Sequence, residues 1–282
     1  MQPTSLPENK SITLANDFST TLIVIEGNLH GMPIVADFSL SVIIPAYNEA
    51  ERLPPTLADC VAYLSQQPYP WEILVVDDGS TDGTLASVLP FQQAYPNNVK
   101  TVTYGKNRGK GYAVQQGILA AQQGYCLLYD ADAAVPLGDV ERFFSALVAN
   151  PHAVVIGSRN ISAPDIERRV KWYRKLIGRC FNLLLGQVTP TIVDTQCGFK
   201  LIPTAKAQQL ATLQQENGFA FDVEYIHLSQ QLGWQVVECA VNWHHVPGSK
   251  VHLMKDSWRM FLSVQRIGKR SASGEYGSFH TD

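Results

Sequence analysis

The sequence predicts an α/β fold with a largely parallel central sheet and helices on both of its faces. Three observations predict this fold. Short apolar runs alternate with amphipathic helical segments, most of these runs end in polar residues and turn-forming residues, and 45% of the 282 residues are hydrophobic while 17% are charged. Strands covered by helices on both faces read as continuous apolar runs. A chain of this length fits one α/β domain.

The first predicted strand is Val42–Ile44, which Pro45 ends. A helix follows over residues 53–64, because Leu53, Leu57, Val61 and Leu64 then share one face. Pro54 and Pro55 are compatible only with the first turn of that helix.

The second predicted strand is Ile73–Val76, and residues 99–104 form the third. Residues 109–124 read as a helix ended by glycine, and residues 125–129 form the fourth strand. The strand–helix alternation is what places these strands in one sheet.

Polar side chains follow three of these strands. In sheets of this kind the ligand lies beyond the carboxyl ends of the strands, so we expect the polar clusters to converge at one edge. The clusters are Tyr47, Asn48 and Glu49 after the first strand, Asp77, Asp78 and Ser80 after the second, and Asp130 and Asp132 after the fourth.

The Asp130-Ala131-Asp132 stretch brings two carboxylates to the end of a buried strand. Alone, such a stretch is also compatible with a solvated turn. Crowded carboxylates repel each other, so a cation or hydrogen-bond donors must offset their charge. Mg²⁺ or Mn²⁺ suits such oxygen ligands and commonly binds substrate phosphates as well. Beside a nucleotide diphosphate, the ion would stabilise the negative charge of the leaving group.

The Asp77-Asp78-Gly79-Ser80 stretch has two interpretations. An acid at a strand end accepts hydrogen bonds from a base or a ribose hydroxyl, and Tyr47 offers an aromatic face to a base. Alternatively, the acids belong to a capped helix start that includes Asp82, Gly83 and Thr84.

Taken in order, the motifs "VIIPAYNEAERL", "VVDDGSTDGT", "NRGKGYAVQQG" and "DAD" resemble the inverting glycosyltransferases of family two. The later motifs "VVIGSR", "DTQCGFKL", "FDVE" and "VNWHHVPGSK" are similar to the dolichyl-phosphate β-glucosyltransferase branch and the related dolichyl-phosphate mannosyltransferases. The quoted motifs run from Val42 to Lys250. The resemblance implies the GT-A fold, a Rossmann-like α/β/α sandwich. A dinucleotide-binding site fits less well, because "GKGYAV" lacks the full glycine pattern.

The resemblance also implies roles for individual residues. The nucleoside would be held by Pro45, Tyr47, Glu49, Val76 and Asp78. Asp130 and Ala131 would contact ribose and diphosphate, and Asp132 would bind the metal directly with Asp130 beside it. Arg159 and Lys250 would neutralise the phosphates. Ala134 stands where mannosyltransferase relatives can place a further metal-binding residue, which departs from the mannosyl pattern.

The expected reaction is transfer of a hexose, with glucose from UDP-glucose favoured, to a polyprenyl phosphate. The alternatives are mannosyl transfer from GDP-mannose, hexosyl transfer to a soluble hydroxyl, and a nucleotide-sugar-binding protein without turnover. The resemblance places Asp194 at an active-site acid position, and Asp222 and Glu224 are further candidates. For Asp222 the alternative is a charge at a helix N-terminus.

Two basic amphipathic segments support an anionic acceptor. The first places Arg168, Lys171, Arg174, Lys175 and Arg179 on one side of a helix. The second, over residues 254–270, carries Lys255, Arg259, Arg266 and Arg270. Such helices can lie in a membrane interface, and the alternative is a solvated charged face over a packed core. We expect no nucleic-acid partner, because the formal net charge is −3 and the basic field is narrow.

We expect one domain over residues 39–270, with a nucleotide-sugar half to residue 135 and an acceptor half from residue 136. Residues 1–38 form a partly ordered extension and residues 271–282 a tail. The five cysteines are scattered without a C-x-x-C pair, which disfavours zinc and disulfide scaffolds. No apolar run approaches the roughly 20 residues of a membrane span. The expected location is therefore the cytoplasm, with peripheral contact to the cytoplasmic face of a membrane.

Overall fold

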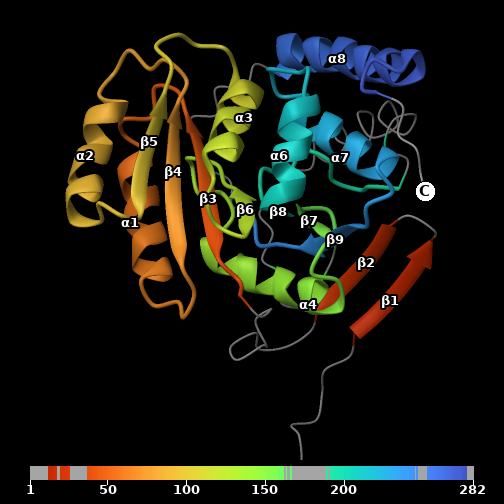
Figure 1. Cartoon of the computed structure of the whole chain (residues 1–282), viewed down its shortest axis with the longest axis horizontal. Coiled ribbons are helices and arrows are strands. Elements are labelled where there is room, and N and C mark those ends of the chain that lie inside the picture. The colour runs from red at the N-terminus through yellow and green to blue at the C-terminus, as the bar shows by residue number, and fades with distance from the viewer. Residues whose placement is uncertain are drawn as a thin grey trace, which may run out of the picture.

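The structure is a computed structural model that describes residues 12–17, 20–25, 37–161, 163, 166, 189, 191–244, 246 and 253–277. Within these residues the chain forms an α/β/α sandwich around one nine-stranded sheet (Figure 1). The elements on the first half of the sheet are β3 (Leu40–Ala46), α1 (Leu53–Leu64), β4 (Trp71–Asp77), α2 (Thr84–Ala94), β5 (Val99–Thr103), α3 (Lys110–Ala120) and β6 (Tyr125–Leu128).

The remaining elements complete the sheet and its covering helices. They are η1 (Leu137–Val140), α4 (Glu141–Ala149), β7 (Val154–Ser158), β8 (Lys200–Pro203), α6 (Thr204–Leu213), α7 (Phe221–Gln231), β9 (Val236–Ala240) and α8 (Leu253–Ser273), with β1 (Ile12–Asp17) and β2 (Thr20–Ile25) at the N-terminal end.

The strand order is β1-β2-β9-β7-β8-β6-β3-β4-β5. β6, β3, β4 and β5 are parallel, whereas β8 lies antiparallel between β6 and β7. The predicted, mostly parallel sheet is therefore confirmed, with two reversed strands: β8 inside the sheet and β1 at its edge. β2 pairs with β9 in parallel, so residues that the sequence analysis placed in an extension extend this same sheet.

Alternating side chains of the central strands fill two cores. Val42 and Ile44 of β3 pack in the core that α1 and α4 cover. Ile43, between them, packs in the core that α3, α6 and α7 cover. All three side chains are fully buried. Helices on both faces therefore account for the continuous apolar runs, because neither face of the strand meets water.

Two predicted element ends are wrong, for local reasons. β3 continues through Pro45, which still pairs with β4. The nitrogen of Pro45 faces β6, but β6 ends at Leu128, opposite Ile43. The missing N–H of the proline therefore removes no hydrogen bond between strands. The helix predicted over residues 109–124 ends at Ala120 and not at the glycine, since Ala121 is extended. The Gln122 N–H then donates to Glu72 Oε1 at 2.7 Å.

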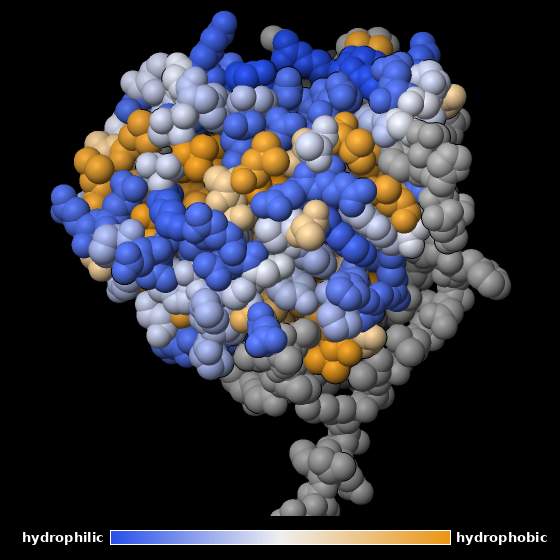
Figure 2. Space-filling view, viewed as in Figure 1, coloured by the Kyte–Doolittle hydropathy of each residue, from blue (hydrophilic) through white to orange (hydrophobic). Residues whose placement is uncertain are grey.

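The C-terminal helix α8 packs its described apolar side on the domain. Val264 and Ile267 are buried against Ala220 and Val223 of the α7 region. This part of the apolar side is therefore buried inside the fold. The upper edge of the molecule, where α8 lies in Figure 1, is mostly hydrophilic (Figure 2). Among the described residues, none of the helices has the length and apolar character required to cross a membrane.

Candidate functional site

The first two predicted polar clusters interlock at the carboxyl end of the sheet. The Asn48 N–H donates to Ser80 Oγ at 2.9 Å, and Asn48 Oδ1 accepts from the Thr81 N–H at 2.8 Å. The Glu49 N–H donates to Thr84 Oγ1 at 2.8 Å. Tyr47, on this edge, is 39% exposed, so its ring is accessible to a ligand. The predicted convergence of these two clusters is confirmed.

Asp78 is buried and fixes the segment that leads into α3. Its carboxylate accepts hydrogen bonds from the backbone N–H groups of Arg108 at 2.7 Å and Gly109 at 2.9 Å. The side chains of Tyr104 and Asn107 donate to it as well, at 2.8 Å and 3.0 Å. In the structure the donors to the Asp78 carboxylate are groups of residues 104–109. The nucleoside-binding role of Asp78 stays a prediction.

Val76 and Ala131 are buried, whereas Pro45 is partly buried. Val76 packs in the core beneath α3, so its predicted nucleoside contact would come from the main chain. The Ala131 carbonyl accepts from Thr56 Oγ1 at 2.8 Å, which ties the loop after β6 to α1.

Asp130 and Lys110 form an ion pair at the N-terminus of α3. Lys110 Nζ lies 2.6 Å from Asp130 Oδ1. Burial opposes ionisation of Asp130, but attraction to Lys110 outweighs it and lowers the pKa of this carboxyl below its ordinary value. Asp130 therefore stays ionised at neutral pH.

Asp132 has the opposite electrostatic environment. Burial and, next, repulsion by Asp130 raise the pKa of Asp132 above its ordinary value, although Asp132 Oδ1 accepts from the Ala134 N–H at 3.1 Å. A cation beside the two acids would relieve this repulsion. The carboxylate pair fits Mg²⁺ or Mn²⁺, which typically takes only one or two protein carboxylates. Within the described part of the chain, no three His, Cys, Asp or Glu side chains gather as a metal-binding group.

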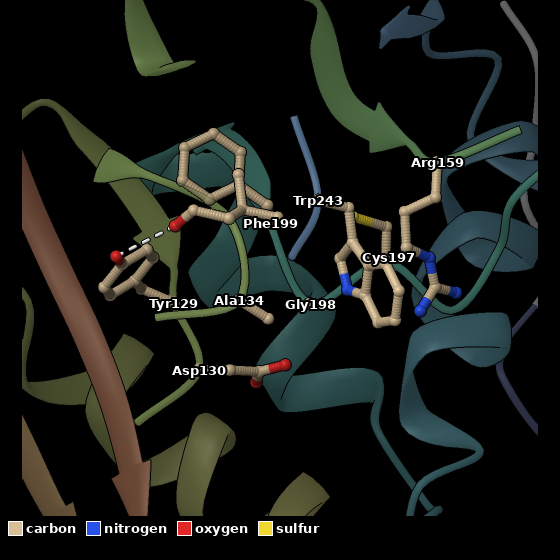
Figure 3. Close-up of a pocket in the computed structure, with 9 residues that line it drawn as sticks. Tyr129, Asp130, Ala134, Arg159, Cys197, Gly198, Phe199 and Trp243 are labelled. Atoms are coloured by element: carbon tan, nitrogen blue, oxygen red, sulfur yellow. Dashed lines mark hydrogen bonds between the residues drawn. The ribbon is translucent and has the colours of Figure 1, made fainter. Parts of the chain in front are cut away.

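A cavity opens between the loop after β6 and the segment before β8 (Figure 3). It holds about 290 Å³ of empty space, part of it open to solvent. Asp130 and Arg159 contribute charge, and the aromatic rings stand around the same opening. The lining residues are Tyr129, Asp130, Ala134, Val135, Arg159, Cys197, Gly198, Phe199 and Trp243.

Gly198 forms the surface against which the Asp130 side chain lies. A β-carbon at position 198 would be 2.3 Å from Asp130 Oδ2 and 2.7 Å from Oδ1. Only glycine leaves room for the carboxylate in this position. The segment before β8 thus helps to orient the first acid of the pair.

Arg159 is held at the cavity by Asp194, one of the predicted catalytic acids. Its Nε donates to Asp194 Oδ2 and its Nη2 to Oδ1, both at 2.8 Å, and the Arg159 N–H donates at 2.9 Å. Burial opposes ionisation of Asp194, but Arg159 lowers the pKa of this carboxyl below its usual range. An acid with a lowered pKa is a weak general base. The catalytic role of Asp194 stays a prediction.

Asp222 forms a buried ion pair with Lys200, whose Nζ also donates to the Cys197 carbonyl at 2.6 Å. Burial raises the pKa of Asp222 despite Lys200 and Lys110. Glu224 faces elsewhere: it accepts from the Gln215 and Glu216 N–H groups at 3.0 and 2.9 Å. The charges of Lys110, Asp130, Lys200 and Asp222 thus act on one another.

Several predicted residues lie outside the described part of the chain: Lys250 and the basic set Arg168, Lys171, Arg174, Lys175 and Arg179. Conversely, the structure adds residues to which the sequence analysis gave no role, namely Lys110, Gly198, Lys200 and Trp243. All four occur within motifs that carry the resemblance, so these motifs could have pointed to them. The sequence does not show which residue each of them contacts.

Comparisons with known proteins agree with this geometry. The family model described as glycosyl transferase family 2 matches residues 41–210. A dolichyl-phosphate β-glucosyltransferase of Dictyostelium discoideum is 34% identical over 267 residues, covering 88% of this chain and 82% of that protein. The protein of the same name from Saccharomyces cerevisiae is 36% identical, with 78% and 71% covered.

A solved structure shares the fold at lower identity. Glucosyl-3-phosphoglycerate synthase of Mycobacterium tuberculosis, in complex with Mn²⁺ and UDP-glucose, superposes with a TM-score of 0.62. It is 17% identical, and the match covers 90% of this chain and 88% of that one. The predicted GT-A fold is thereby confirmed.

Proposed function

Because the chain belongs to glycosyltransferase family 2, we propose that it transfers glucose from UDP-glucose to a dolichyl-type polyprenyl phosphate, with inversion at the anomeric carbon. The observation that carries the proposal is the similarity to dolichyl-phosphate β-glucosyltransferases, which extends over most of both chains. The acids at the end of β6 and the adjoining cavity supply a site of the required chemistry.

The donor would bind along the carboxyl end of the sheet. Tyr47 would stack on the base, and Pro45, Glu49, Val76 and Asp78 would complete the nucleoside site with Ala131 near the ribose. UDP-glucose is favoured over GDP-mannose because the relatives that cover most of this chain are named glucosyltransferases. Arg159, whose side chain is 32% exposed at the cavity, would face the diphosphate, with Lys250 as the second cation.

Asp132, with Asp130 beside it, would hold Mg²⁺ or Mn²⁺. When bound, the ion would offset the charge that develops on the departing diphosphate. The raised pKa of Asp132 supports this assignment, since partial burial and the neighbouring charge of Asp130 disfavour its ionised form and a bound cation would favour it. Lys110 already balances Asp130.

The glucose would occupy the cavity beside Asp130. Trp243 provides an apolar wall of the size of a sugar ring, and Arg159 and Asp130 provide polar groups at its edge. Ala134 contributes only a methyl group to the lining of this cavity.

The acceptor phosphate needs no general base. Its second pKa is about 6, so it is mostly dianionic at pH 7. One of its oxygens forms the bond to C1 of glucose while the bond from C1 to the diphosphate oxygen breaks, and the electron pair leaves with UDP. We propose that Asp194 and Asp222 act by holding Arg159 and Lys200 near Asp130. The basic set from Arg168 to Lys175 would attract the acceptor.

The test is a transfer assay with UDP-glucose, Mn²⁺ and a polyprenyl phosphate in detergent. Glucosyl-phosphoryl lipid with a β linkage is expected. GDP-mannose and a soluble hydroxyl acceptor serve as comparison substrates, and faster transfer with either would contradict the proposal. Binding of UDP-glucose without turnover would identify a binding protein instead.

A further inference from the structure

Lys110 stands between two glycines that a distant loop, residues 214–218, holds in place. A β-carbon on Gly109 would lie 2.5 Å from the Asn217 carbonyl oxygen, and one on Gly111 would lie 2.6 Å from the Glu216 carbonyl oxygen. The Tyr112 N–H also donates to the Asn217 carbonyl at 3.2 Å. The position of the loop therefore determines where the first turn of α3 lies.

The other side of this loop is tied to α8 through Glu216. Arg266 Nη2 lies 3.0 Å from Glu216 Oε2, and Arg270 Nη1 lies 2.9 Å from Oε1. Glu216 is only 5% exposed, and burying its carboxylate would be costly without the compensating positive charges of these two arginines. Two of the four basic residues of the stripe predicted over residues 254–270, for which a membrane interface and a solvated face were the two interpretations, thus contact Glu216 of the domain.

A second attachment involves Glu224 and the segment after α8. Glu224 accepts from the N–H groups of Gln215 and Glu216, and Tyr276 Oη donates to Glu224 Oε1 at 2.6 Å. Glu224 is fully buried. The loop is therefore fastened to the C-terminal segment by both a side chain and its backbone.

We propose that Glu216 is a positioning residue for the transfer site: α8, through Arg266 and Arg270, holds loop 214–218 against α3 and so holds Lys110 against Asp130. The catalytic part of this inference rests on the proposed function. The physical reason is that the Gly109-Lys110-Gly111 turn has glycines on both sides of the lysine. Its backbone is intrinsically permissive. Asp78 holds the start of the turn through the Gly109 N–H, and the close contact with loop 214–218 restricts the rest of it.

The first experiment measures amide hydrogen exchange and requires no substrate. In Glu216→Gln we expect exchange at residues 109–113 to be roughly tenfold faster, because local opening of this turn becomes easier. Arg266→Gln, in which the replaced side chain is 50% exposed, tests the same contact without burying a new group. Lys269→Gln, an exposed charge on the same helix, is the matched control and should leave exchange unchanged.

The second experiment is a double-mutant cycle on kcat/KM for UDP-glucose. Glu216→Gln should lower kcat/KM about tenfold in the wild-type background and less than about twofold in a Lys110→Met background, because the two residues act through one contact. Equal losses in both backgrounds overturn the proposal, as does unchanged exchange at residues 109–113 in both variants. A wild-type protein that transfers no glucose refutes the proposed function instead, and the exchange measurement still decides the positioning role.

Discussion

The carboxylate of Asp130 occupies the space in which a side chain at Gly198 would lie. The hypothetical β-carbon would be 2.3 Å from Asp130 Oδ2, well inside van der Waals contact. Two segments far apart in the chain thus determine one orientation, and Lys110 Nζ lies 2.6 Å from Oδ1 of the same carboxylate.

Gly198→Ala should displace Asp130 and lower glucosyl transfer by roughly a hundredfold, while overpacking costs about 1–3 kcal/mol of unfolding free energy. Steady-state kinetics and urea unfolding measure the two effects. The matched control is Gly138→Ala, whose β-carbon would lie 3.6 Å from the Tyr63 ring, an ordinary contact. Full activity in Gly198→Ala would show that the orientation of Asp130 is not required.

Asp132→Asn should abolish the stimulation of transfer by Mn²⁺, with a loss of roughly a hundredfold or more. Stability in metal-free buffer should stay equal or rise, because the variant removes the repulsion that raises the pKa of Asp132. Activity is followed in a Mn²⁺ titration and stability by thermal unfolding. Glu51→Gln, an exposed acid nearby, is the control. An unchanged Mn²⁺ response would remove Asp132 as a metal ligand.

Trp243→Leu should weaken binding of UDP-glucose about tenfold, equivalent to about 1.4 kcal/mol, and leave binding of UDP nearly unchanged. The reason is that the indole ring lines the cavity proposed for the hexose. Calorimetric titrations with both ligands provide the comparison. Trp234→Leu, a partly buried tryptophan beside Lys206, controls for general loss of packing. Equal weakening of both ligands would place the hexose elsewhere.

The Asp194–Arg159 pair predicts a pH dependence of stability. Since the pKa of Asp194 is lower in the folded protein, the pair stabilises the fold at neutral pH. This contribution is lost as the pH falls from about 4, the unfolded-state value, through the lowered folded value. Asp194→Asn should lower the free energy of unfolding at pH 7 by about 3 kcal/mol. The unfolding free energy of this variant should also fall less steeply as the pH is lowered.

Urea unfolding at a series of pH values measures this difference. Asp59→Asn, which changes an exposed acid, should leave both the stability at pH 7 and its acid slope nearly unchanged. Parallel pH profiles for the wild type and Asp194→Asn would contradict the assigned role of the pair.

Local sequence patterns were sufficient to predict the strands and helices of the first half of the sheet and the sheet edge at which the acids lie. The helix predicted from the spacing of Leu53, Leu57, Val61 and Leu64 is found as α1, because apolar spacing on one face and prolines in the first turn are local properties. The polar clusters after β3, β4 and β6 converge because parallel strands bring their carboxyl ends together. The predicted strand end at Pro45 is wrong because the effect of a proline depends on where the neighbouring strand stops.

The partner of each acid depended on the tertiary structure. Arg159 meets Asp194 and Gly198 meets Asp130 because β8 lies antiparallel between β6 and β7, which brings the segment before it beneath the loop after β6. Likewise, the spacing of Arg266 and Arg270 predicts a basic stripe that faces solvent or a membrane, whereas in the structure both form ion pairs with Glu216. Residue type and local periodicity are sufficient to predict the chemical groups and the sheet edge that presents them. Which positive charge neutralises which acid follows from the fold alone, because ion pairing depends on distances between segments that no local pattern specifies.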